Sequence, residues 1–148
     1  MLIGIPPILG PELLSTLRAM GHGDEIALVD GNYPAEEHAR RIIRADGIEL
    51  LPMLDAILRV LPIDDFIEDA IFRSSAKGIP SEVAPVHGDI ENLIRKHAPG
   101  RTITPLAGAD FYARVAAAHV VIATSEPLLY ANVILRKGVI YPEKGSNA

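Results

Sequence analysis

Short apolar runs alternate with helical patterns along the chain, and this alternation restricts the fold more than any other feature of the sequence. The run Val120–Thr124 is the clearest buried strand, because its apolar and β-branched residues follow one another without a charge. The helical segments carry leucines and isoleucines at the spacing of one helix face. Strands separated by helices are typical of βαβ units. The sequence therefore predicts an α/β layered fold with a largely parallel central sheet flanked by helices.

The individual elements follow from the same patterns. We expect helices at residues 11–20, 48–61, 88–97 and 110–118, and strands at residues 25–30, 41–47, 65–75, 102–106, 120–124 and 133–135. An extended arm at residues 3–9 should precede the first helix, because Pro6 and Pro7 interrupt it. Pro105 confines its strand to an edge of the sheet, since proline has no N–H to donate. Asp110 is the expected cap of the last helix.

Length and composition favour one soluble domain over residues 1–148. Hydrophobic residues make up 49% of the 148 residues, which is enough for one core. No apolar run approaches the ~18 residues of a membrane span, and no basic region precedes the apolar start, so a cytoplasmic protein without a membrane partner is expected. The net charge of -5, without a basic cluster, argues against nucleic acid as a partner. The lack of cysteine excludes disulfides and thiolate metal sites.

The best candidate for chemistry is His22, which lies between two glycines just before an apolar strand that ends at Asp30. Gly21 and Gly23 leave the backbone and the imidazole open to a ligand. Histidine ordinarily gives and takes protons near neutral pH. Asp30 is expected at the carboxyl end of its strand, where open α/β sheets place their ligands. In the alternative interpretation, Gly21 is only a helix C-cap and Asp30 is only a turn residue.

Other kinds of site find little support in the residue spacing. The five histidines show no HxH or HxxxH spacing, and the remaining metal alternative combines His22 with Asp24 and Asp30. We expect no metal. Neither a phosphate-binding glycine loop nor the GxSxG turn of serine hydrolases is present. What remains is a histidine with carboxylates, hydroxyls and amides near strand ends, which suits proton transfer on a small polyhydroxylated molecule.

Six short motifs occur in order over nearly the whole chain. They are Gly21-His-Gly-Asp-Glu-Ile26, Asp30 with Tyr33-Pro-Ala35, Ile43-Arg-Ala-Asp-Gly47, Phe111-Tyr-x-Arg114, Ala123-Thr-x-Glu126, and Tyr130-x-Asn132 followed by Ile134-Leu-Arg-Lys-Gly-Val139. Together they resemble the RbsD/FucU family of ribose pyranases and L-fucose mutarotases. The resemblance is closest to the fucose mutarotase branch.

The resemblance implies an RbsD-like fold and an isomerase without a cofactor that interconverts the α and β anomers of a free monosaccharide, L-fucose or a related sugar. By position, His22 matches the family's acid/base and Asp30 matches a substrate-binding carboxylate. Tyr130 and Asn132 match the sugar-binding segment, and Glu126 is a further expected sugar contact. The family also forms homo-oligomers, commonly decamers of two stacked pentamers, with sites at subunit contacts.

One departure from the family pattern concerns the sugar. Gly108 stands where the fucose branch usually has a substrate-contacting arginine, and glycine offers no donors to sugar hydroxyls. Arg101 or Arg114 can replace that guanidinium only if the fold places one of them at the sugar site. We expect Arg114 to be a charge on a helix surface. The identity of the sugar therefore stays open. Alternative functions are a non-catalytic sugar-binding or transport-associated accessory protein, a structural ring-forming protein, or ribose pyranase-type activity.

Overall fold

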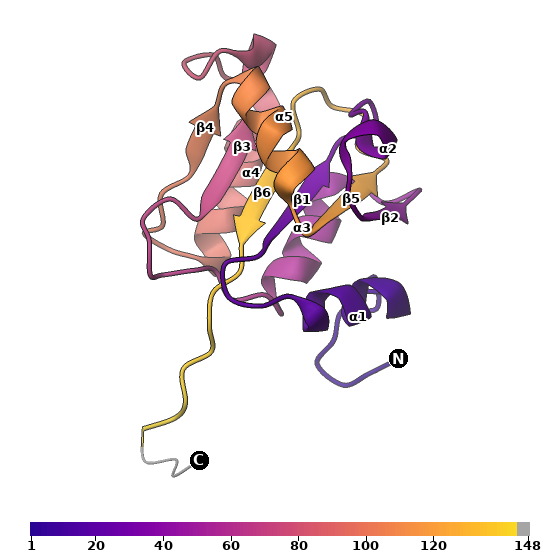
Figure 1. Cartoon of the computed structure of the whole chain (residues 1–148), viewed down its shortest axis with the longest axis vertical. Coiled ribbons are helices and arrows are strands. Elements are labelled where there is room, and N and C mark those ends of the chain that lie inside the picture. The colour runs from indigo at the N-terminus through magenta and orange to yellow at the C-terminus, as the bar shows by residue number, and fades with distance from the viewer. Residues whose placement is uncertain (145–148) are drawn as a thin grey trace.

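The computed structural model describes residues 1–144 and is built around one six-stranded sheet with the order β2-β5-β1-β6-β3-β4 (Figure 1). The strands are β1 (Glu25–Val29), β2 (Ile42–Ala45), β3 (Ile71–Ser74), β4 (Thr104–Leu106), β5 (Val120–Thr124) and β6 (Val133–Arg136). β6 runs antiparallel to β1 and β3, and the other pairings are parallel. The predicted α/β fold with a largely parallel sheet is confirmed.

Helices cover both faces of the sheet. They are α1 (Pro11–Ala19), α2 (Ala35–His38), α3 (Leu50–Leu58), α4 (Pro85–His97) and α5 (Gly108–Ala117), with a 3-10 turn η1 (Ala76–Gly78). Successive strand residues point to opposite faces. Ile26 and Leu28 of β1 therefore join the core under α1, α3 and α4, whereas Ala27 and Val29 join the core under α2 and α5. None of the helices within residues 1–144 is long and apolar enough to cross a membrane.

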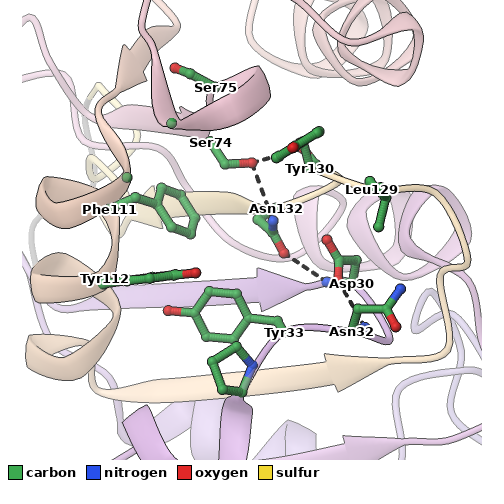
Figure 2. Close-up of a pocket in the computed structure, with 13 residues that line it drawn as sticks. Asp30, Asn32, Tyr33, Ser74, Ser75, Phe111, Tyr112, Leu129, Tyr130 and Asn132 are labelled. Carbon is green, nitrogen blue, oxygen red and sulfur yellow. Dashed lines mark hydrogen bonds between the residues drawn. The ribbon is translucent and has the colours of Figure 1, made fainter.

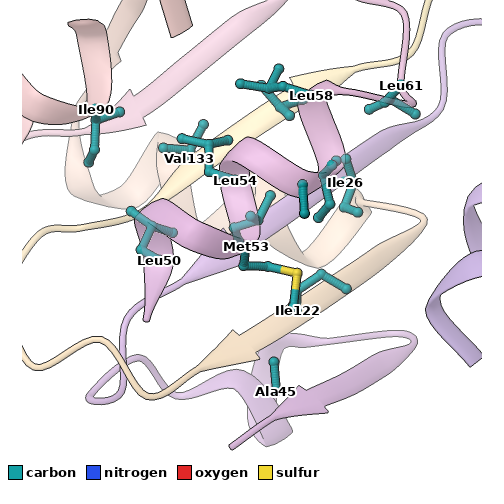
Figure 3. Close-up of a cluster of buried hydrophobic side chains, with 14 of the residues drawn as sticks. Ile26, Ala45, Leu50, Met53, Leu54, Leu58, Leu61, Ile90, Ile122 and Val133 are labelled. Carbon is teal, nitrogen blue, oxygen red and sulfur yellow. The ribbon is translucent and has the colours of Figure 1, made fainter. Parts of the chain in front are cut away.

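Helix α3 forms the centre of the larger core (Figure 3). Its Met53 and Leu54 are fully buried and pack with Ile26 and Ile122 of the sheet. Each such side chain contributes roughly 1.5–3 kcal/mol when it is removed from water. Pro52 falls in the first turn of α3, where a missing N–H breaks no helical hydrogen bond. The predicted helix at residues 48–61 is therefore present, with slightly narrower bounds.

Strand β6 is antiparallel to its neighbours because the segment between β5 and β6 is too short for a parallel crossover. β5 ends at Thr124 and β6 begins at Val133. A parallel crossover needs about a dozen residues or more, so the chain turns back at the same edge of the sheet. This return places Tyr130 and Asn132 at the edge where β1 and β3 end.

The observed elements differ from the sequence prediction at several boundaries. Only β3 forms within the strand expected at residues 65–75, and the short helix α2 was not predicted. Helix α4 begins at Pro85, earlier than expected. The N-cap of α5 is Ala107, so the expectation that Asp110 caps this helix was wrong. Asp110 lies in the first turn, where a carboxylate still interacts favourably with the helix dipole. The expected arm folds into turns and buries Leu9.

Candidate functional site

A cavity of about 210 Å³ opens at the edge of the sheet where β1 and β3 end and β6 begins (Figure 2). The loops after these strands, the loop before β6 and the first turns of α5 form its walls. Its polar lining consists of Asp30, Asn32, Tyr33, Ser74, Ser75, Tyr112, Tyr130 and Asn132. Within residues 1–144, Asp30 is the only charged side chain that lines this cavity. The position agrees with the rule that open α/β sheets bind ligands beyond the carboxyl ends of their strands.

The Asn132 side chain connects the three strands at this edge (Figure 2). Its Oδ1 accepts a hydrogen bond from the Asp30 backbone N–H at 2.8 Å, and its Nδ2 donates to the Ser74 Oγ at 3.2 Å. Because a backbone N–H can only donate, this bond fixes the orientation of the amide. The Ser74 hydroxyl donates in turn to the Tyr130 carbonyl at 2.8 Å. The structure thus brings together Asp30, Tyr130 and Asn132, three of the residues selected from the sequence.

The Asp30 carboxylate is 6% exposed and faces the cavity. Burial raises the pKa of Asp30, and hydrogen bonds from the Asn32 N–H and the Asn132 side chain partly oppose this rise. The Asn32 N–H donates to Oδ1 at 2.9 Å. A buried carboxylate in this setting is a strong acceptor for the hydroxyl groups of a ligand.

Aromatic rings form the wall of the cavity next to α5. Tyr33 and Tyr112 meet edge to face, with ring centroids 5.6 Å apart. The Tyr33 hydroxyl forms a 2.9 Å hydrogen bond with the Nδ1 of His38. Burial raises the pKa of Tyr33, so its phenol stays protonated. The wall offers apolar ring surface beside polar hydroxyls, a combination that suits a small polyhydroxylated ligand.

His22 lies at the opposite end of β1 from this cavity. The first and last of the five residues of this strand are four steps of ~3.3 Å apart, which separates its ends by about 13 Å. A histidine side chain cannot cover that distance. The His22 Nε2 lies 3.0 Å from the Asp64 Oδ1, and the His22 ring meets Phe66 edge to face at 4.5 Å. The His22 side chain is 36% exposed, so part of the ring is open to a ligand from outside the chain.

Asp64 contacts His22 and is a candidate site residue that sequence reasoning missed. It is fully buried and accepts hydrogen bonds from the Arg136 Nε at 2.7 Å and from the Phe66 N–H at 3.1 Å. Burial alone raises the pKa of such a carboxyl, but these bonds and the one from His22 outweigh it and lower the pKa of Asp64 to about 2. The ionised carboxylate orients the imidazole through its contact with Nε2.

The two glycines beside His22 have different roles. Gly23 has a φ of +87°, and a Cβ added there would lie 2.9 Å from the Arg136 Nη2. The backbone at Gly21 is not left-handed, and α1 ends at Ala19 with an extended C-cap at Met20. The interpretation of Gly21 as a left-handed C-cap is therefore wrong. Gly23 is the position at which the close approach of Arg136 requires glycine.

Comparison with known proteins assigns the chain to a family. The model of the RbsD / FucU transport protein family matches residues 3–140. The chain belongs to this family. Over 145 residues it is 39% identical to the fucose mutarotase of Homo sapiens, covering 93% of each chain. It is 40% identical to the fucose mutarotase of Streptococcus pneumoniae, whose structure was solved in complex with L-fucose. That comparison covers 95% of this chain and 100% of the other, with a TM-score of 0.87.

A more distant member shares the fold alone. RbsD from Bacillus subtilis, solved in complex with D-ribose, is 18% identical to this chain and covers 90% of it, or 95% of its own length, with a TM-score of 0.68. The relatives at about 40% identity are named for fucose, and the predicted resemblance to the fucose branch of the RbsD/FucU family is confirmed.

Glu126 lies outside the cavity lining and is 4% exposed, and the sugar contact expected for it stays a prediction. Its Oε2 accepts from the Leu50 N–H at 3.2 Å, and its Oε1 accepts from the Leu128 N–H at 3.0 Å. Both oxygens therefore satisfy backbone donors, one of them at the start of α3. The structure gives Glu126 the role of a buried cap.

Gly108 lines the cavity, and neither candidate arginine replaces the guanidinium usual in the fucose branch. Arg114 lies on α5 with its side chain 35% exposed, where it donates to both carboxylate oxygens of Glu25 and lies 3.7 Å over the ring of Phe72. Arg101 donates to the backbone carbonyls of Asp64 and Ile67.

The structure does not bring His22, Asp24 and Asp30 together as the ligands of a metal ion. In the part of the chain that the structure describes, no three histidine or carboxylate groups are placed to hold a metal ion. Asp24 instead accepts a hydrogen bond from the Gly21 N–H at 2.7 Å, while His22 pairs with Asp64.

Proposed function

We propose that this protein is a mutarotase that interconverts the α and β anomers of L-fucose or a related free sugar. The main support for this proposal is the cavity, in which one buried carboxylate, Asp30, lies among uncharged hydroxyl and amide groups. Such a lining matches a neutral polyhydroxylated ligand, because hydroxyl groups both donate and accept hydrogen bonds. A sugar acid would meet the like charge of Asp30. The relatives named fucose mutarotase support the same reaction class.

The reaction needs a group that moves protons. The anomeric hydroxyl loses a proton, the bond between the anomeric carbon and the ring oxygen breaks, and the ring oxygen gains a proton to give the open aldehyde. Rotation about the bond next to the aldehyde and closure by the reverse steps yield the other anomer. A positioned acid/base is worth about 10²–10⁴-fold in such steps. We assign this role to His22, with Asp64 holding the orientation of its ring.

The cavity that binds the sugar and the histidine that acts on it have to come from different copies of the chain. His22 and Asp30 lie at opposite ends of β1, so one chain cannot place both on one sugar. Apolar residues are exposed near each end, with Phe66 60% exposed beside His22 and Leu129 58% exposed at the cavity. These exposed apolar side chains are available for contact with another copy of the chain. We therefore propose that His22 of one copy completes the cavity of a neighbour in a homo-oligomer, with the decamer of two stacked pentamers as the expected assembly.

Within the cavity, Asp30 accepts hydrogen bonds from the sugar, and Tyr130 and Asn132 orient it. Asn132 uses its Oδ1 for the Asp30 N–H and an N–H for the Ser74 hydroxyl, and so it fixes the position of Asp30 beside the sugar. Because position 108 is glycine, the cavity wall at the start of α5 has no arginine side chain at that position. We expect the sugar to be held there by hydroxyl groups and ring surface instead.

Saturation-transfer NMR on free sugars tests the proposal. With L-fucose and the wild-type protein, we expect magnetisation to pass between the two anomer signals. His22→Ala should abolish this exchange and leave the oligomer intact by size-exclusion chromatography. Unchanged exchange in this variant would remove His22 from the mechanism. Line broadening without exchange would identify a sugar-binding accessory protein, and pyranose–furanose exchange of D-ribose would identify ribose pyranase-type activity.

A further inference from the structure

The backbone at Tyr130 has an unusual conformation for a residue with a side chain. Its φ is +64°, and Lys77 is the only other non-glycine residue within residues 1–144 with a positive φ. L-residues rarely adopt this region unless the surrounding structure holds them there. Tyr130 also lines the cavity, and Ala131 after it is fully buried. Something must therefore hold this turn in the wall of the proposed sugar site.

Two side chains from different elements hold the Tyr130 carbonyl. The Ser74 hydroxyl donates to it from the end of β3 at 2.8 Å, and the His87 ring lies against it from α4, with Nε2 at 3.0 Å. Ser74 also lines the cavity, but His87 does not. His87 therefore acts on the cavity from behind, through the backbone.

The hydrogen-bond partners of His87 determine which ring nitrogen carries the proton. His87 is fully buried. Its Nδ1 accepts from the Ala84 N–H at 3.1 Å, at the N-terminus of α4. The proton of the neutral ring is therefore on Nε2, which donates to the Tyr130 carbonyl. Burial and the nearby Arg73 lower the pKa of His87, against the opposing effects of the Tyr130 carbonyl and Glu91. The ring stays neutral, as this pair of bonds requires.

We propose that His87 is a positioning residue for the sugar site. It links the start of α4 to the Tyr130 carbonyl and so maintains the left-handed turn at Tyr130 in the cavity wall. The same turn sets Asn132, two residues later, against Asp30 and Ser74. This inference rests on the proposed function insofar as the ligand of the cavity is a sugar.

Three variants test the proposal. His87→Leu removes both ring nitrogens, whereas His87→Gln keeps an N–H donor and a carbonyl acceptor. Ile94→Val is the matched control, because it opens a small gap at a fully buried position of the same helix without changing a hydrogen bond. The readouts are the Kd for L-fucose by calorimetry, the KM and kcat of anomer exchange, and the φ of Tyr130 in a crystal structure of His87→Leu.

We expect His87→Leu to raise Kd and KM about tenfold, the effect of one buried hydrogen bond, with kcat within about twofold because His22 comes from another copy. His87→Gln should recover most of this loss, Ile94→Val should show none, and Tyr130 should leave the positive-φ region in His87→Leu. Wild-type Kd and KM in His87→Leu, no recovery in His87→Gln, or an unchanged φ would each overturn the proposal. Wild-type protein that binds L-fucose without exchanging it would overturn only the proposed function, and if it bound no sugar the φ measurement would still decide about His87.

Discussion

At the scale of single residues, the two glycines beside His22 allow a matched comparison. An alanine at position 23 must adopt the left-handed backbone and would place its Cβ 2.9 Å from the Arg136 Nη2. This displaces the guanidinium that holds Asp64, and with it the orientation of His22. An alanine at position 21 meets only the Asp24 Oδ2, at 3.7 Å.

We predict that Gly23→Ala lowers the rate of anomer exchange about tenfold and the free energy of unfolding by about 1 kcal/mol or more. Gly21→Ala should keep both near the wild-type values. Saturation-transfer NMR and urea unfolding measure the two effects. Equal behaviour of the two variants would show that the contact of Gly23 with Arg136 does not control His22.

The Asp64 carboxylate predicts a pH dependence of stability. Its pKa is lowered from the ordinary 3.8 to about 2 in the folded protein. The stabilisation from a depressed carboxyl pKa is complete above the unfolded value and disappears as the pH falls through the folded value. Asp64→Asn removes the titrating group but keeps the size of the side chain. The difference in urea midpoint between wild type and Asp64→Asn should therefore be constant above about pH 4 and shrink toward pH 2. A difference that does not vary over this range would contradict the assignment.

Asp30 could be selected from its position at the end of an apolar strand, and Tyr130 and Asn132 could be selected because they match the sugar-binding segment of the family. Asp64 could not be selected in this way. It lies 42 residues from His22 in sequence, in a loop rich in carboxylates, and only the fold brings the two together. Its pairing with Arg136 also depends on the isolated bridge between Ile63 and Lys137, which no sequence spacing indicates.

At the scale of elements, helices and strands with clear periodicity were predicted and the others were not. α1, α3, β1 and β5 follow from apolar spacing alone. α2 is a single turn of four residues and is too short to show a period. The expected strand at residues 65–75 was too long because its first half contains Asp65, Glu68 and Asp69, which favour a solvated loop. The direction of β6 depends on the length of the preceding loop and on pairing with strands distant in sequence.

Glu126 provides a prediction about α3. Its carboxylate accepts the N–H of Leu50 at the start of this helix and the N–H of Leu128 in the loop before β6. Glu126→Ala should lower the free energy of unfolding by about 1–3 kcal/mol, since the buried Leu50 N–H and the partly buried Leu128 N–H lose their acceptor. The Kd for L-fucose should change less than about twofold. Glu49→Ala is the control, because Glu49 is exposed at the N-cap of α3 and its side chain makes no capping bond. A large loss of sugar affinity in Glu126→Ala would restore Glu126 to the binding site.

At the scale of the whole molecule, the two halves of the proposed site lie at opposite edges of one sheet. The cavity opens at the carboxyl ends of β1 and β3, and His22 precedes the amino end of β1. A contact between the cavity edge of one copy and the His22 edge of another joins two different surfaces. Such head-to-tail contacts close into rings when the rotation between copies allows it. The geometry of one chain thus supports a cyclic assembly in which every copy both receives and supplies a catalytic group.

Mixed oligomers test this arrangement directly. Asp30→Asn disables the cavity of a copy, and His22→Ala disables the histidine that it supplies to a neighbour, so each variant alone should show no exchange. When both are co-expressed with different tags in equal amounts, random assembly gives about one quarter of the sites a wild-type His22 from one copy and a wild-type Asp30 from the next. We therefore predict that the purified mixed oligomer recovers about a quarter of the wild-type exchange rate per site. A site contained within one chain would leave the mixture as inactive as its parents, because no copy carries both residues.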